Sequence, residues 1–230
     1  MRKVLSQLIT ENCPTIIIVD FNDSYTYNIA SECTDYAERR GLPLEMLVLP
    51  WKKAVMDLRK ICLDEINKNR KVAVILGPGP GEPDGYPEFQ KIIKWFLVSD
   101  DIYLMGICLG FQLIVQGLGG KVKKSIMPMH GRSVNFRVPK WEGVFNRSDW
   151  KKVLKVQRYN SLSMDVKNLD VKMDKIYLEN GEFFAGSCMN CLMYQFHPES
   201  IGTSCPSIFF SPLFNFLYNI KDDEECKNQD

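Results

Sequence analysis

The first half of the chain alternates between two patterns of apolar residues. Continuous apolar runs, several of them rich in β-branched residues, predict buried strands at residues 15–20, 44–49, 72–76 and 102–105. Between and after these runs, apolar residues recur at helical spacing, which predicts helices at residues 25–40, 54–66, 89–97 and 107–117. This alternation predicts a doubly wound α/β sheet that binds ligands at the carboxyl ends of its strands.

The second half of the chain changes character. From residue 121 to residue 196 the pattern predicts mainly short strands and turns, with antiparallel additions to the sheet, including strands at 182–187 and 191–196. The polar stretch 158–162, taken alone, indicates a loop. Pro206 is expected to open a last helix that ends near residue 220, before a charged, frayed tail at 221–230. Without a repeat, a low-complexity linker or a break in composition, we expect one domain over residues 1–230, with its core at about 15–220.

Composition adds little and excludes some classes of protein. The chain has 230 residues, of which 45% are hydrophobic and 25% charged, as in an ordinary soluble protein. A formal net charge of +1 offers no electrostatic case for a nucleic acid or a membrane surface as partner. No apolar run approaches the roughly 20 residues that cross a bilayer. The apolar part of residues 1–12 is too short and interrupted for a secretory signal, so we expect a cytoplasmic protein.

Eight cysteines do not form the framework of a small disulfide-rich scaffold in a chain of this length. Cys188 and Cys191 form a C-x-x-C pair, but no second pair or neighbouring histidines complete a zinc site. We interpret the pair as part of a turn and expect no metal and no cofactor. The other cysteines, apart from Cys108, are expected to be structural.

The strand at 102–105 runs into the sequence Gly-Ile-Cys-Leu-Gly at residues 106–110. This G-x-C-x-G is the thiol version of the nucleophile elbow, in which glycines permit a sharp strand-to-helix turn that exposes the central side chain. Cys108 would then lie at the N-terminus of a helix, where backbone N–H groups favour an anion. The pattern predicts that Cys108 is a nucleophile.

A cysteine nucleophile needs a base and a group that orients the base, and the chain has only two histidines. His197 ends an apolar strand and precedes Pro198, which favours an extended backbone. In an extended segment, Glu199 projects to the same side as His197 and can hold its ring. His130 is the rival base, but no carboxylate is near it in sequence, and we expect it in a loop or an interface. Cys108, His197 and Glu199 are therefore the predicted triad.

Acyl transfer also needs donors for an oxyanion. The elbow itself places the amide of Leu109 for this role. The glycine-proline loop at residues 77–83 can supply a second amide, from Gly79 or Gly81, because glycines let N–H groups approach a ligand closely. The alternative, a phosphate cradle, lacks the endings of a P-loop and of a dinucleotide fold.

Five motifs together resemble the class I (triad-type) glutamine amidotransferases, and most of all the small subunits of anthranilate synthase and aminodeoxychorismate synthase. Residues 20–28 (DFNDSYTYN) are similar to the family's D-N-Y-D-S-F-T-Y-N, and residues 77–83 (GPGPGEP) to its S-P-G-P-G-x-P. Residues 106–112 (GICLGFQ), 129–132 (MHGR) and 195–200 (QFHPES) resemble G-[IV]-C-L-G-H-Q, M-H-G-K and Q-F-H-P-E-S. The motifs follow the family's order from about residue 15 to residue 220.

The resemblance implies a flavodoxin-like, three-layer αβα fold with a central, mostly parallel sheet. It also implies hydrolysis of L-glutamine to glutamate and ammonia through a γ-glutamyl thioester on Cys108, with the oxyanion on Leu109 and Gly79. The residues expected to contact glutamine are Gly79, Gly81, Gln112, Ser161 and Leu162. Ammonia would pass to a separate synthase subunit that acts on chorismate, for which this chain has no room.

Two residues depart from the family's pattern. Phe111 stands where histidine is commonest after the elbow, and Asn160 replaces the histidine of R-Y-H-S-L. Neither position belongs to the triad, so the departures bear on regulation and on coupling to the partner.

Other interpretations stay open at this point. A free-standing cysteine hydrolase of γ-glutamyl compounds would share the fold and the triad without a partner. A catalytically idle interaction module is the third possibility, against which the intact triad argues. The partner's product, anthranilate or 4-amino-4-deoxychorismate, is also left open.

Overall fold

The computed structural model describes residues 13–140, 152–169 and 171–220. The elements of the first half are β1 (Thr15–Asp20), α2 (Thr26–Arg39), β2 (Glu45–Pro50), α3 (Trp51–Ile66), β3 (Val72–Leu76), the 3₁₀ turn η1 (Pro83–Gly85), α4 (Phe89–Phe96), β4 (Ile102–Ile107) and α5 (Leu109–Gly117). Those of the second half are β5 (Lys121–Arg137), β6 (Val153–Asp165), β7 (Asp174–Tyr177), β8 (Phe183–Cys188), β9 (Cys191–Tyr194) and α6 (Pro206–Tyr218).

A seven-stranded sheet forms the middle layer, with the strand order β2-β1-β3-β4-β9-β8-β7. Strands β2, β1, β3, β4 and β9 are parallel, and β8 and β7 extend the sheet in antiparallel pairing. The interior strands β3 and β4 are buried along their whole length, whereas the edge strand β2 alternates between covered and exposed positions. Continuous apolar runs therefore lie where helices cover both faces, as the sequence predicts.

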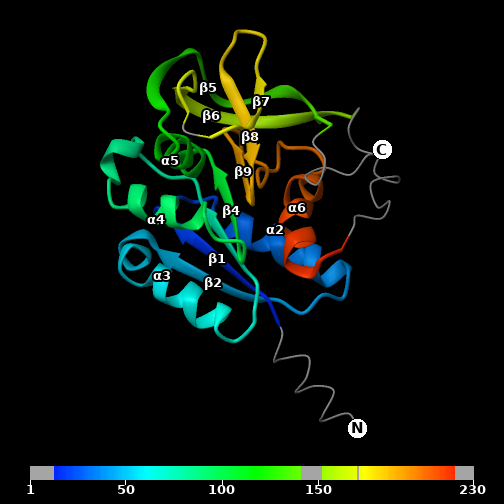
Figure 1. Cartoon of the computed structure of the whole chain (residues 1–230). Helices are drawn as coiled ribbons and strands as arrows, with labels where there is room; N and C mark the ends of the chain where they lie inside the picture. The colour runs from blue at the N-terminus through cyan, green and yellow to red at the C-terminus, as the bar shows by residue number, and fades with distance from the viewer. Residues whose placement is uncertain (1–12, 141–151, 170, 221–230) are drawn as a thin grey trace.

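Side chains of the central strands alternate between two hydrophobic cores. On one side, Ile16, Ile18 and Ile75 pack with residues of α2 and α6. On the other side, Ile17 and Val74 pack with residues of α3, α4 and α5. The alternation follows from the two-residue period of a strand, and it produces the two helical layers in Figure 1. The three-layer αβα fold is confirmed.

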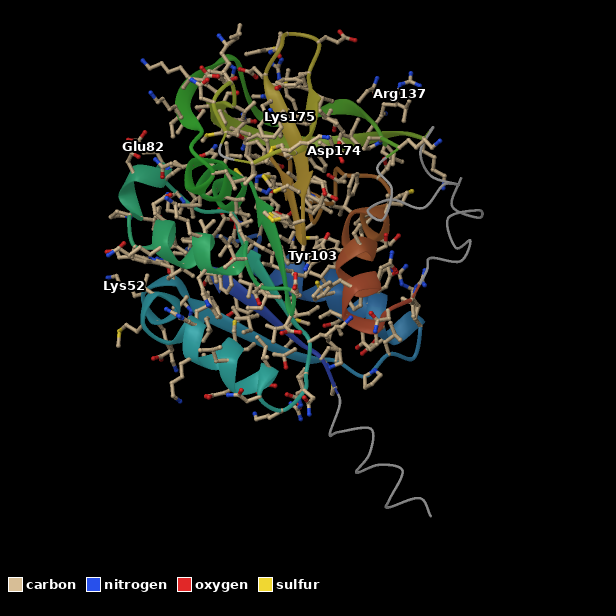
Figure 2. The ribbon with its side chains drawn as sticks, in the orientation of Figure 1. Lys52, Glu82, Tyr103, Arg137, Asp174 and Lys175 are labelled. Carbon is tan, nitrogen blue, oxygen red and sulfur yellow. The ribbon has the colours of Figure 1, made fainter. Side chains whose placement is uncertain are left out.

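Tyr103 of β4 illustrates this arrangement on the α6 side. Its label in Figure 2 lies between the sheet and that helix, and its ring is 5.4 Å from the ring of Phe216. Burial raises its pKa well above the ordinary value for a tyrosine.

Cys188 and Cys191 lie opposite each other at the closed end of the β8–β9 hairpin. The two residues between them form the turn, in which Met189 has a φ of 50°. Both thiols are free and buried. The interpretation of the C-x-x-C as a turn is confirmed, and the hairpin aligns β9 parallel to β4.

The expectation of mainly short strands after residue 121 is wrong for β5 and β6. These strands have 17 and 13 residues and pair with each other in a separate antiparallel ribbon. The polar stretch 158–162, expected as a loop, lies within β6. Its polar side chains are typical of a loop, but the backbone of β6 pairs with β5 on both sides of a bulge between Lys124 and Met129.

The remaining boundaries agree with the predicted elements to within a few residues, and α6 begins at Pro206 as expected. The predicted tail at 221–230 lies outside the described residues. In the part of the chain that is described, none of the helices has both the length and the apolar character that crossing a bilayer requires.

Candidate active site

Cys108 occupies a strained turn between β4 and α5. Its φ of 54° and ψ of −102° lie outside the regions that residues with side chains usually adopt. Its amide donates to the carbonyl of Tyr194 at 2.9 Å, which ties the turn to the end of β9. The thiol stays partly exposed at the N-terminus of α5, as the elbow motif predicts.

The glycines of the elbow are required by close packing. A Cβ on Gly110 would stand 1.9 Å from the carbonyl oxygen of Leu76, and one on Gly106 would stand 2.6 Å from the side chain of Ile114. Helix α5 can approach β3 at Gly110 and β4 at Gly106 this closely only without side chains at these positions.

His197 and Glu199 form a buried pair beyond the end of β9. The imidazole Nδ1 lies 2.7 Å from Glu199 Oε1, and the two residues are 2% and 3% exposed. Because β9 is parallel to β4 and adjacent to it, His197 and Cys108 lie at the same edge of the sheet. Glu199 engages Nδ1, so the other ring nitrogen is the one left for the thiol.

The charge on His197 depends on these two neighbours. Burial lowers the pKa of His197, but charge interactions with Cys108 and Glu199, together with the hydrogen bond to Glu199, outweigh burial and hold that pKa well above its ordinary value. The site therefore favours a protonated imidazole beside Cys108. A cysteine attacks carbonyl carbon as its thiolate, and a neighbouring imidazolium stabilises a thiolate.

The ribbon holds the segment that carries His197. The amide of His197 donates to Gln157 of β6 at 2.9 Å. Thr203 accepts from the amide of Gln157 at 3.0 Å and donates to the carbonyl of His197 at 2.6 Å. The two hydrogen bonds of Gln157 join β6 to the turn after β9, a connection that the sequence pattern did not predict. The hydrogen bond between Thr203 and His197 stabilises the turn itself.

The glycine-proline loop lies against the elbow. A Cβ on Gly79 would stand 2.7 Å from the side chain of Leu109, so these two predicted oxyanion residues are neighbours. The amide of Gly110 donates to Gly77 at 3.1 Å, and the Tyr86 hydroxyl donates to Pro80 at 3.0 Å, which anchors the loop at two points.

Gly81, the alternative donor, has a φ of 80°, and a Cβ built there meets no atom within 4 Å. It occupies the open part of the loop, where the positive φ favours glycine.

Two side chains of the first turn of α5 face different surroundings. Gln112 is buried, and its Nε2 donates to Gln195 Oε1 at 3.2 Å. Phe111 packs in the core on the face of the sheet that α5 covers, opposite the face that α6 covers. Its ring is 5.1 Å from the ring of Phe183. Phe111 thus replaces the expected histidine with a core residue.

Ser161 and Leu162 lie on β6, opposite the bulge in β5. Ser161 Oγ is 2.9 Å from Nε2 of His130, so the rival base is engaged by a serine rather than by the triad. Asn160 Nδ2 donates to the carbonyl of Leu162 at 2.8 Å. The tertiary link between this stretch and the triad is Tyr159, whose ring lies 5.1 Å from that of His197.

A buried ion pair that sequence reasoning missed supports this part of β6. Arg158 Nη2 lies 3.2 Å from Glu182 Oε2, and both side chains are almost fully buried. Arg158 Nε also donates to Asn160 Oδ1 at 3.0 Å, and Glu182 accepts from the amide of Ile126. The partners are 24 residues apart in the chain, so no local pattern signals the pair.

Among the described residues, no group of three or more His, Cys, Asp or Glu side chains is arranged to hold a metal ion. The chemistry that the geometry supports is nucleophilic attack by a thiolate with proton transfer by an imidazole.

Comparisons with known proteins show which family the sequence belongs to. The family described as glutamine amidotransferase class-I matches residues 17–219. Anthranilate synthase component 2 of Lactococcus lactis is 30% identical over 218 residues, which cover 93% of this chain and 99% of that protein. The protein of the same name from Cyanophora paradoxa is 31% identical over 207 residues, with 88% and 99% covered.

The fold has relatives among solved structures. A glutamine amidotransferase from Thermotoga maritima has a TM-score of 0.57 at 16% identity, over 81% of this chain and 76% of that one. With its sequence matched over nearly its whole length, this chain belongs to the class I glutamine amidotransferase family.

Proposed function

We propose that this chain is the glutaminase subunit of a chorismate-directed synthase, with Cys108, His197 and Glu199 as its triad. The observation that carries the proposal is the strained elbow, which presents Cys108 at the same sheet edge as a histidine bound to a buried carboxylate at 2.7 Å. We further propose that residues 1–230 form one domain.

In the first half-reaction, the Cys108 thiolate attacks the side-chain amide carbon of glutamine and a C–S bond forms. The amides of Leu109 and Gly79, neighbours in the structure, would donate to the oxyanion. His197 then gives its proton to the amide nitrogen, the C–N bond breaks, and ammonia leaves a γ-glutamyl thioester on Cys108.

In the second half-reaction, His197 accepts a proton from water as the water oxygen attacks the thioester carbon. The C–S bond breaks, glutamate leaves, and the proton returns the histidine to its starting state beside the thiolate. Glu199 keeps the ring oriented and stabilises its charge in both steps.

Glutamine would contact Gly79, Gly81, Gln112, Ser161 and Leu162. Of these, Gln112 is held by Gln195 and Ser161 by His130, so their side chains are already oriented before glutamine binds. We propose that ammonia passes to a separate subunit that aminates chorismate. The names of the relatives, anthranilate synthase component 2, support anthranilate as the product over 4-amino-4-deoxychorismate.

Glutamate release from glutamine tests the proposal. It is measured with the purified chain alone and with each chorismate-directed synthase subunit of the source organism. We expect stimulation by the anthranilate synthase subunit. Stimulation by only the aminodeoxychorismate synthase subunit would move the protein to that pathway, and strong activity unchanged by either would indicate a free-standing hydrolase.

The Cys108→Ser variant tests the nucleophile. We expect it to abolish amination with glutamine, by at least about 10³-fold, and to leave amination with added ammonia intact, since ammonia bypasses this subunit. Cys205→Ser is the matched control, because Cys205 also precedes a helix at a positive φ of 50°. Retained glutamine-dependent activity in Cys108→Ser would contradict the proposed chemistry.

A further inference from the structure

Three rings meet at the proposed catalytic histidine. Tyr25, which precedes α2, lies 5.3 Å from the His197 ring between centroids, and Tyr159 of β6 lies 5.1 Å from it. The two tyrosine rings are 5.4 Å apart, so the three centroids form a nearly equilateral triangle. The tyrosine rings are inclined to the imidazole by 52° and 86°, so both lie against it, and they come from elements far apart in the sequence.

The two hydroxyl groups join the tyrosines to each other. Their mutual hydrogen bond, reinforced by burial, raises the pKa of Tyr25 to about 12, and the same bond lowers the pKa of Tyr159. Both side chains also hydrogen-bond Ser200, next to Glu199. These contacts link the start of α2 to the ribbon across His197.

We propose that Tyr25 and Tyr159 are positioning residues, whose rings cover the His197 imidazole, exclude water from it and hold it in the orientation that serves Cys108. This inference deepens the proposed function and rests on it for its catalytic meaning. The arrangement of the rings is independent of any assumption about glutamine.

A charged imidazole gains from this environment. The π faces of aromatic rings attract a cation, and the attraction is stronger where water is excluded. The groups that face His197 are Cys108 from the start of α5, Glu199 from the same turn, and the two tyrosines. Burial, together with the charges of Asp35 and Glu199, raises the pKa of Glu32 of α2. Of these, the tyrosines alone can be changed without removing a charge.

Two kinds of substitution separate the effect of the rings from that of the hydroxyls. Tyr25→Phe and Tyr159→Phe keep the rings and lose the bond between the hydroxyls. Tyr25→Leu and Tyr159→Leu lose the rings. We expect each leucine variant to lower the titration midpoint of His197 by about half to one and a half pH units, and each phenylalanine variant to change it less.

The measurement is an NMR titration of the imidazole signals of the full chain. Only two histidines are present, and a His130→Asn variant assigns them. Heat unfolding of each variant establishes that it is folded. In the glutaminase assay, the leucine variants should lower kcat more than they raise KM, since the rings act on the proton carrier and not on glutamine.

Tyr27→Leu is the matched control, because Tyr27 lies two residues from Tyr25 and is 69% exposed. It should leave the midpoint of His197 unchanged. Folded leucine variants with the wild-type midpoint would overturn the proposal, and so would phenylalanine variants that shift it as much as leucine. A chain without glutaminase activity would overturn the proposed function, and the titration would still decide the role of the rings.

Discussion

Single atoms decide whether the elbow can form. At Gly110 the missing Cβ leaves room for the carbonyl oxygen of Leu76, and Cys108 has a positive φ in a turn that leaves it partly exposed. At His197, burial lowers the pKa of the imidazole and the neighbouring charges raise it, and the charges have the larger effect. Each of these residues can be tested alone.

Gly110→Ala should disrupt the elbow. The added methyl group would stand 1.9 Å from a backbone atom that cannot move without shifting β3. We expect a loss of at least about 2 kcal/mol in the free energy of unfolding and a fall of about 4 °C or more in Tm. Calorimetry measures both. Gly85→Ala, where a Cβ meets nothing within 4 Å, is the control and should unfold as the wild type does.

Glu199→Gln should change the pH dependence of stability. Because the pKa of His197 is raised on folding, its proton stabilises the fold fully below the unfolded-state pKa of about 6.5 and less as the pH rises through the folded-state pKa. The variant loses one cause of that raised pKa. We expect its Tm to lie below the wild-type Tm near pH 6, with a difference that narrows at alkaline pH. A difference independent of pH would show that the pair does not act through its charge.

Between elements, the important connections run from the seven-stranded sheet to the ribbon. Glu182, which precedes β8, reaches Arg158 of β6, and Arg158 in turn reaches Asn160. Burying such an ion pair is costly unless hydrogen bonds satisfy both partners, and here Asn180, Ser125 and Ile126 contribute to lowering the pKa of Glu182 against its burial. The network holds the strand that carries Ser161 and Leu162.

Asn160→Leu should therefore affect glutamine binding. It removes the acceptor of Arg158 Nε and the donor to the carbonyl of Leu162. We expect the KM for glutamine to rise about tenfold, equivalent to about 1.4 kcal/mol, with a smaller change in kcat.

Ser163→Ala is its control on the same strand, since the buried Ser163 hydroxyl has no hydrogen-bond partner among the described residues. A fall in Tm with an unchanged KM in Asn160→Leu would limit the network to a structural role. Asn160→His, which restores the residue of the family's pattern, tests whether an imidazole can replace both hydrogen bonds.

Across the whole molecule, burial is uneven. Strands β3 and β4 are covered along their length, whereas most side chains of β5 are exposed. Helical layers protect the central sheet (Figure 1). The ribbon is held by its own pairing, by its hydrogen bonds to the turn after β9 and by the buried residues of β6.

Hydrogen exchange followed by mass spectrometry should reveal this difference. We expect peptides of β1, β3 and β4 to exchange at least about 100-fold more slowly than peptides of β5, because the sheet opens only with the core while the ribbon opens locally. Equal protection of β5 and β3 would contradict the separate stability of the ribbon.

Local patterns were sufficient for the elements of the first half and for proposing the triad. The continuous runs of β1, β3 and β4, the G-x-C-x-G elbow and the two-residue spacing of His197 and Glu199 all act within a few residues, where backbone geometry directly determines which way a side chain points. The resemblance to the family supplied Gln112, Ser161 and Leu162 as expected contacts of glutamine.

The tertiary structure alone decided the rest. The length of the β5–β6 ribbon, the burial of Arg158 against Glu182 and the tyrosine rings beside His197 join residues that are far apart in the chain. Polar residues at 158–162 look like a loop until their partners are known, because a buried polar group is stable only where another segment satisfies it. The spacing of apolar residues along the chain indicates which positions are buried, and the tertiary fold determines which residues bury them.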